Sequence, residues 1–285
     1  MVRCIHKSTT GEQFWNSEKA NIIDLYVNRG MSLKAIGDVY NCWGSTIKNH
    51  LDDWGIQPHR RYNNIYDLAA IDYFSAIDDE HKAYWYGFLL ADGHVNKTGI
   101  SITIQHQDVY MLEALKKDIG SEVPIGKNTL GYPTFSLSCR EFAKHLLDKG
   151  FNNRKSYCLD INKVSSYVPE HLKHHFVRGM FDGNGCVKYY KYDYQTTPFF
   201  HLGYTGLKNV CDYIYNTFKL SGKYKVEGNE IFTVTTKNYR KINEINDYLY
   251  EDATIYLIRK KKTFDEIRLM TFNDYNRDIP NGMKV

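Results

Sequence analysis

The sequence predicts an α+β protein: a pseudo-twofold pair of half-domains, each ordered αββαββα, preceded by a small three-helix domain. A short apolar helical motif occurs twice, at Trp85–Gly93 and Phe176–Gly185, and similar helical and alternating patterns follow each copy. The composition agrees, because 24 tyrosines and only 6 prolines among 285 residues suit strand-rich halves.

Each copy of the motif carries two small residues four positions apart. The pairs are Gly87 with Ala91, and Gly179 with Gly183. Residues at this spacing share a helix face, and small side chains let two helix backbones approach closely. Each copy then ends in a polar residue and a glycine, Asp92 in the first and Asn184 in the second. We therefore expect the two helices to pack together and to bring Asp92 and Asn184 side by side, as a candidate metal site.

The two halves are predicted from hydrophobic periodicity and turn signals. In the first half, Asp78 or Asp79 caps the motif helix. The elements expected after it are a hairpin over 93–105, a helix over 109–119, strands at 123–129 and 132–138, and a helix over 140–149. In the second half, we expect a motif helix over 169–183, strands at 186–193 and 198–205, a helix over 207–220, a hairpin over 223–236 and a helix from Asn238.

Residues 18–57 show three short helical patterns, with Ser32 as the cap of the second. Helix, short turn and helix is the helix-turn-helix arrangement, and the exposed face of its last helix mixes residues that bind phosphates and read bases. These candidate DNA-binding residues are Trp43, Ser45, Thr46, Lys48 and Asn49. The alternative is a helical protein-binding module. The expected domains are 1–57, a linker at 58–78, and half-domains at 79–165 and 166–285.

The overall composition excludes few classes of protein. The net charge of +4 permits a nucleic-acid partner without requiring one. We find no signal peptide, no long apolar run and no C-x-x-C pair among the six cysteines. These absences favour a reduced cytoplasmic protein with free thiols, no membrane segment and no structural zinc. His171, His174 and His175 have a spacing that could hold a metal, but without acidic partners nearby we expect a solvated helix face.

A basic pair closes each predicted half: Arg154-Lys155 in the first and Arg259-Lys260 in the second. Matching lysines at matching places suit a pseudo-symmetric site, although a basic run such as 259–262 usually faces solvent.

Over residues 78–270, the chain resembles the two-repeat LAGLIDADG homing endonucleases. The resemblance rests on Ala83–Gly93, His175–Gly185, both Arg-Lys pairs and Ala253–Leu257. It implies a monomeric, sequence-specific DNA endonuclease of intron homing, in a bacterial or phage context, acting on a long asymmetric double-stranded target. It also implies two saddle-shaped antiparallel sheets that lie in the DNA major groove. Sheet residues of a type suited to DNA contact are Lys97, Gln105, Lys127, Lys188, Lys191 and Lys237.

The resemblance further implies Mg²⁺, or Mn²⁺, held by Asp92 and Asn184 together with the backbone carbonyls of Ala91 and Gly183. Lys155 and Lys260 would then stabilise charge on the scissile phosphate as catalytic residues. Metal ions at such a place supply both a nucleophile at neutral pH and relief of charge on the leaving oxygen.

Asn184 departs from the family pattern, which has an acidic residue there. An amide ligates weakly and cannot act as a base. Asp182 cannot replace it, because two positions correspond to about 200° around a helix. The chain could therefore nick one strand, could bind nucleic acid without cleavage as an RNA maturase or transcription regulator, or could be an engineered inactive form.

A structural α+β protein without a metal site is the remaining interpretation. Under it, Asp92 is an ordinary carboxylate at a helix C-terminus, where the helix dipole disfavours an anion. A bound cation would relieve that unfavourable placement.

Overall fold

The computed structural model describes residues 9–29, 31–56, 71–152, 159–191, 198–220, 223–225 and 231–270. The chain divides into two compact units, Met1–Ile65 and Tyr66–Val285. None of the helices in these described ranges is long and apolar enough to cross a membrane.

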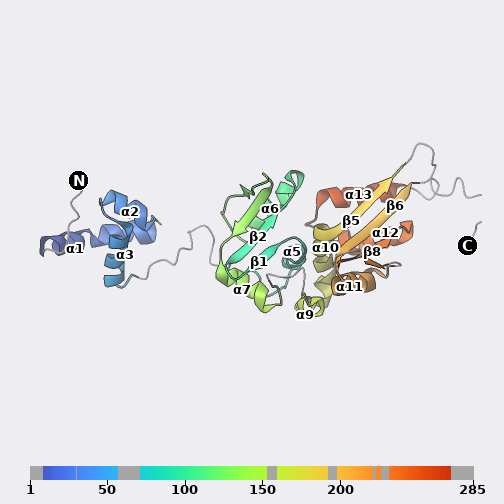
Figure 1. The fold of residues 1–285 in the computed structure, drawn as a ribbon, viewed down its shortest axis with the longest axis horizontal. Coiled ribbons are helices and arrows are strands. Elements are labelled where there is room, and N and C mark those ends of the chain that lie inside the picture. Colours follow the sequence, from blue (N-terminus) through green and yellow to red (C-terminus); the bar gives the residue numbers. More distant parts are fainter. Residues whose placement is uncertain are drawn as a thin grey trace, which may run out of the picture. The chain divides into compact units, whose positions relative to one another are not determined.

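The first unit is helical (Figure 1). Its elements are α1 (Thr9–Ile23), the π-helical η1 (Asp24–Asn28), α2 (Leu33–Val39) and α3 (Gly44–Asp53). Ser32 caps α2, as predicted, by accepting a hydrogen bond from the Ala35 backbone N–H at 3.1 Å. The core is formed by Trp15, Ile22, Tyr26, Ile36, Ile47 and Leu51.

Two details of this unit differ from the sequence prediction. The first helix begins at Thr9 rather than near Glu18, and its early turns bring Trp15 into the core. The apolar spacing of Leu33, Ile36 and Val39 predicts that all three face inward, but Val39, the last residue of α2, is 62% exposed.

The second unit repeats one topology twice (Figure 1). The first half contains α5 (Glu80–Ala91), β1 (His94–Asn96), β2 (Gly99–Thr103), the 3-10 helix η2 (His106–Asp108), α6 (Val109–Asp118), β3 (Gly126–Lys127), β4 (Pro133–Leu137) and α7 (Arg140–Asp148). The second half contains the 3-10 helix η3 (Glu170–Leu172), α10 (Lys173–Asn184), β5 (Gly185–Tyr190), β6 (Phe199–Leu207), α11 (Lys208–Phe218), β7 (Lys223–Lys225), β8 (Ile231–Thr236) and α12 (Tyr239–Tyr250).

Both sheets are antiparallel and have corresponding strand orders. The first is β1-β2-β4-β3 and the second is β5-β6-β8-β7. The predicted α+β class and the αββαββα order of each half are therefore confirmed.

Each half is followed by a helix that the sequence analysis did not predict. These are α9 (Ile161–Ser166) and α13 (Ile258–Leu269). Helix α9 is too short to show periodicity. In α13, the buried positions are Lys260, Phe264 and Ile267. A lysine at the first inward position hides the helical pattern, and the expectation that the basic run 259–262 faces solvent is wrong for Lys260.

Helices α5 and α10 lie side by side between the two sheets (Figure 1). All residues of 83–90 and of 175–182 are buried, as expected for helices that are covered on every face. A Cβ added at Gly87 would lie 2.0 Å from the Phe176 carbonyl oxygen, and one at Gly179 would lie 2.0 Å from the Tyr84 carbonyl oxygen. The predicted close packing through small residues is thus confirmed.

A buried arginine joins the halves near the start of these helices. The Arg178 side chain is fully buried and donates to a Glu80 carboxylate oxygen at 2.6 Å. It also donates to the backbone carbonyls of Leu249 and Ile255 and to Nδ1 of His175. These partners satisfy a charge that would otherwise be costly to bury.

We expect His175 to make stability depend on pH. Burial, and then the Arg178 guanidinium, lower the pKa of His175 to about 4, so the folded chain binds fewer protons than the unfolded chain above that pH. Stability should therefore fall by about 2 kcal/mol as the pH drops from 6.5 to 4. Urea unfolding of the wild-type chain and of His175→Gln at pH 7 and 4.5 measures this effect. The variant should lose less stability, and equal losses in both proteins would contradict the assignment.

Candidate functional site

The C-terminal ends of α5 and α10 carry the two residues on which the sequence analysis depends. Asp92 caps the end of α5 and Asn184 is the last residue of α10, and both are exposed. They line separate cavities rather than one shared site. Each cavity is lined by the polar residue at the end of one helix and by the residue just before the polar residue of the other helix. Asp92 thus lies in one cavity with Gly183, and Asn184 lies in the second with Ala91.

The Asp92 cavity, as we call the first, has a volume of about 310 Å³. Its polar lining is contributed by Asp92, Thr103, Gln105, Asp108, Tyr132, Asp182 and Arg259. Asp108 is only 3% exposed, and it accepts a hydrogen bond from Arg259 Nε at 2.9 Å. That ion pair joins the two halves, because Arg259 lies on α13 and Asp108 ends η2.

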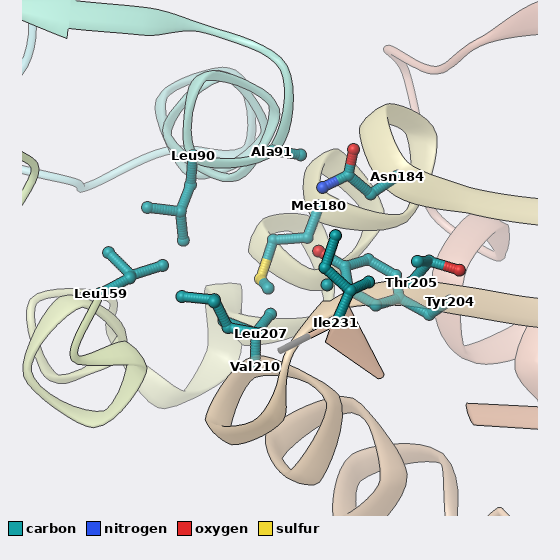
Figure 2. A pocket seen from close by; sticks show the side chains of 11 residues that line it. Leu90, Ala91, Leu159, Met180, Asn184, Tyr204, Thr205, Leu207, Val210 and Ile231 are labelled. Atoms are coloured by element: carbon teal, nitrogen blue, oxygen red, sulfur yellow. The ribbon is translucent and has the colours of Figure 1, made fainter. Parts of the chain in front are cut away.

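The Asn184 cavity, the second, has a volume of about 220 Å³ (Figure 2). Its apolar lining consists of Leu90, Leu159, Met180, Leu207, Val210 and Ile231. The Asn184 side chain hydrogen-bonds to the Tyr204 hydroxyl, whose pKa is raised by burial. Tyr204 is 2% exposed and lines the same cavity.

Lys260 lies behind the end of α10. It is 4% exposed, and its Nζ donates to the backbone carbonyl oxygens of Phe181 at 2.8 Å and Asp182 at 2.6 Å. Burial lowers its pKa to about 8, and the negative charge of Asp182 opposes this effect. A cation here also complements the C-terminal end of the helix dipole. The predicted partner in the other half, Lys155, lies outside the described residues.

Asp182 does not replace Asn184, in agreement with the helix geometry. Its buried carboxylate accepts from the hydroxyls of Tyr84 at 2.9 Å and Tyr250 at 2.8 Å and from the Leu257 N–H at 2.8 Å. Burial raises the pKa of Asp182, while the charge of Lys260 and these donors lower it. Asp182 therefore fixes α10 to α5 and α12.

The donor set of the Asp92 cavity fits a hard divalent cation. Carboxylates of Asp92 and Asp108, the Gln105 side-chain oxygen and the Gly183 backbone carbonyl are the oxygen ligands that Mg²⁺ prefers. The Asn184 cavity offers amide, hydroxyl and backbone oxygens among mainly apolar side chains. It fits such a cation less well.

The described residues contain one further group that could hold a metal: His174, His175 and Asp252. Asp252 is the acidic partner that the sequence analysis did not find, and it lies 3.1 Å from His174 Nε2. However, Arg178 donates to Nδ1 of His175 at 2.6 Å, so neutral His175 carries its proton on Nε2, toward Asp252. This proton occupies the atom that a metal would need. His171 is exposed and lies outside the group.

The exposed faces of the sheets are now defined by strand register. His94, Ser101 and Ser136 are aligned across the first sheet, and Lys188 pairs with His201 in the second. Lys188 also lies 5.4 Å from the Tyr190 ring centre, and Lys237 lies 4.6 Å from that of Phe199. All six candidate sheet residues are exposed: Lys97, Gln105, Lys127, Lys188, Lys191 and Lys237. Lys127 pairs with Pro133, whose side chain is buried, so its register position belongs to the core-facing set.

In the first unit, the residues proposed to meet DNA lie at and after the start of α3. Trp43 is 75% exposed at the N-cap position, and Ser45, Lys48 and Asn49 are also exposed. Thr46 is half-buried, and Lys48 forms an ion pair with Asp52 at 2.8 Å. Trp43 is not among the residues that pack against the core of this unit.

Asp108 and Tyr204 were missed by the sequence analysis. An aspartate directly before the apolar pattern of 109–119 looks like a helix cap, and a tyrosine in a strand looks like sheet packing. Nothing in either pattern indicates that the residue lies beside a cavity. Arg259 was noticed only as half of a basic pair.

No protein-family model and no curated protein matches the sequence. Among solved structures, a double mutant of I-SmaMI is similar with a TM-score of 0.50 and 14% identity, over 68% of this chain and 92% of that one. The I-LtrWI LAGLIDADG homing endonuclease bound to target DNA has a TM-score of 0.49 and 14% identity, over 73% and 92% of the two chains. The LAGLIDADG homing endonuclease I-GzeII in complex with its DNA target has a TM-score of 0.49 and 13% identity, over 68% and 94%. At this identity the likeness concerns the fold alone: the chain shares the fold of I-SmaMI.

Proposed function

We propose that the protein is a sequence-specific DNA endonuclease of the LAGLIDADG type that hydrolyses phosphodiester bonds with a divalent cation, Mg²⁺ or Mn²⁺. The observation that supports this most is the Asp92 cavity. It sets an exposed carboxylate at the end of α5 beside the Gly183 backbone and the Asp108 carboxylate, at the junction of the two halves. Similar solved structures described as homing endonucleases bound to DNA targets support the same proposal.

In this proposal, each residue of the site would have a separate role. Asp92, with the Gly183 carbonyl, would hold the cation on one side, and Asn184 with the Ala91 carbonyl would face the other strand. When bound, the cation would supply a nucleophile at neutral pH and offset charge on the leaving oxygen. Lys260 would fix the last turn of α10, and so the position of Gly183, through the two carbonyls that it binds. Lys155 would serve the other half.

The partner in this proposal is double-stranded DNA with a long asymmetric target, bound by a monomer. The exposed sheet faces would meet the grooves through Lys97, Gln105, Lys188, Lys191 and Lys237. The first unit would act as a helix-turn-helix that extends the contact, with α3 as its recognition helix.

Cleavage of supercoiled plasmid tests the function directly. The plasmid would carry the uninterrupted sequence that corresponds to the insertion site of the gene, with Mg²⁺ present. We expect nicked or linear product at one position and no product after chelation of the metal by EDTA. Tight binding of the same DNA without any product would favour the second candidate, a non-cleaving RNA maturase or transcription regulator. The observation in favour of that candidate is Asn184 at the place of an acidic ligand.

Deletion of residues 1–57 should weaken DNA affinity by roughly 10²-fold, because it removes one of two linked binding modules. The cut position should not change, since the Asp92 cavity lies entirely in the second unit. Electrophoretic mobility shifts and mapping of the cut site measure the two effects. Unchanged affinity would instead assign the first unit to binding of a protein partner.

A further inference from the structure

The two cavities at the ends of α5 and α10 are built in the same way but have different walls. Each is lined by the polar residue at the C-terminal end of one motif helix and by the residue just before the polar residue of the other. Each is also lined by the end of a central strand, which is β2 in the first half and β6 in the second. This common plan makes their linings comparable position by position.

The clearest difference lies at the start of the second helix of each half. The strand registers give the correspondence, because Thr103 pairs with Thr134 in the first sheet as Thr205 pairs with Thr233 in the second. Counted from these threonines, Gln105 corresponds to Leu207 and Asp108 corresponds to Val210, and each lines the cavity of its own half. Asp108 brings a buried carboxylate that is paired with Arg259. Leu207 and Val210 bring only hydrocarbon side chains.

The orientation of Asn184 adds to this difference. Its side chain is hydrogen-bonded to the buried Tyr204 hydroxyl (Figure 2). An aspartate of the same shape would accept a hydrogen bond from that hydroxyl. Its carboxylate would therefore be engaged with the cavity wall even after the charge is restored.

A hydrated divalent cation needs other polar partners besides a carboxylate. Mg²⁺ keeps several of its waters, and these waters need hydrogen-bond partners in the surrounding wall. In the Asn184 cavity, waters bound to a cation would mainly face hydrocarbon side chains, which offer them no hydrogen-bond partner. Among the described residues, Leu90, Leu159, Met180 and Leu207 offer no such partner in the Asn184 cavity.

We infer that the protein cuts one defined strand of its target, at the Asp92 cavity, and that the apolar wall of the Asn184 cavity disables the second cut independently of Asn184. This inference rests on the proposed function and adds strand choice to it. Restoring the acidic residue with Asn184→Asp should therefore leave the protein a nickase.

The test uses a duplex selected by binding from a randomised library, with a different fluorophore on the 5′ end of each strand. The wild-type protein with Mg²⁺ should cut one labelled strand, with cleavage of the other at least about 10²-fold slower. Asn184→Asp should change the slow strand by less than about tenfold. Asn162→Asp, on the exposed surface of α9, is the matched control for an added negative charge.

Binding of Mn²⁺ to the protein–DNA complex, counted by electron paramagnetic resonance, gives a second readout that does not depend on turnover. We expect one ion for the wild-type protein, one for Asn184→Asp and none for Asp92→Asn. Cleavage of both strands by the wild-type protein or by Asn184→Asp, or two bound ions in Asn184→Asp, would overturn the inference and leave the proposed function intact. Cleavage of neither strand by any of these proteins would overturn the proposed function, and the inference with it.

Discussion

Asp92→Asn should reduce DNA cleavage by about 10³-fold while leaving target affinity nearly unchanged. A bound cation supplies several kcal/mol of transition-state stabilisation, and each 1.36 kcal/mol is worth a factor of ten in rate. The substitution keeps the shape of the side chain but removes the charge that would hold the cation. Because Asp92 is exposed at the end of α5, the change creates no buried cavity and should not disturb folding.

Asp148→Asn is the matched control for this experiment. Asp148 is also an exposed carboxylate at the end of a helix, α7, but it does not line the Asp92 cavity. Single-turnover rates with Mg²⁺ and binding constants with Ca²⁺ in its place would be measured for both variants. Cleavage that persists in Asp92→Asn at the rate of the control would remove Asp92 from the metal site.

The packing of the motif helices could be predicted because its cause is local. Gly87 and Gly179 are needed where each helix meets a backbone carbonyl of the other, and a glycine within an apolar helical run is visible in the sequence. The cap Ser32 was predicted for a similar reason, and Asp79 was one of two predicted candidates, since each accepts a hydrogen bond from a backbone N–H three residues further along.

The walls of the two cavities could not be predicted, because they join residues far apart in the chain. Asp108 and Arg259 form one ion pair across 151 residues, and only the fold brings them together. The exposed face of each sheet was also undetermined, since a shift of one residue in register exchanges the two faces. In the structure, the register of His94 with Ser101 settles this for the first sheet.

Lys260 shows how a local rule can point the wrong way. A run of four basic residues normally faces solvent, yet this lysine is buried because the carbonyls at the end of α10 need donors. Its amino group replaces the solvent that would otherwise satisfy them. Burial of a charged residue for this reason cannot be distinguished in the sequence from an ordinary surface position.

Gly179→Ala should destabilise the second unit by at least about 3 kcal/mol, the upper part of the range for overpacked cores. The new Cβ would lie 2.0 Å from the Tyr84 carbonyl oxygen and 2.8 Å from the Phe88 nitrogen. Both are backbone atoms within α5, so no side chain can rotate away and the helices would have to separate. That separation would also disturb the neighbouring contact of Gly87 with Phe176, where the geometry is the same.

Gly126→Ala is the matched control, because the nearest atom to its added Cβ is the Thr134 carbonyl oxygen at 3.9 Å. Its effect should stay within about 0.5 kcal/mol, as for most surface substitutions. Urea denaturation followed by circular dichroism compares the two variants with the wild-type chain. A separation of α5 and α10 would also move Gly183 away from Asp92, so any folded fraction of Gly179→Ala should bind DNA but cleave it slowly. Equal stability of the two variants would mean that the helices do not approach as closely as the glycine contacts require.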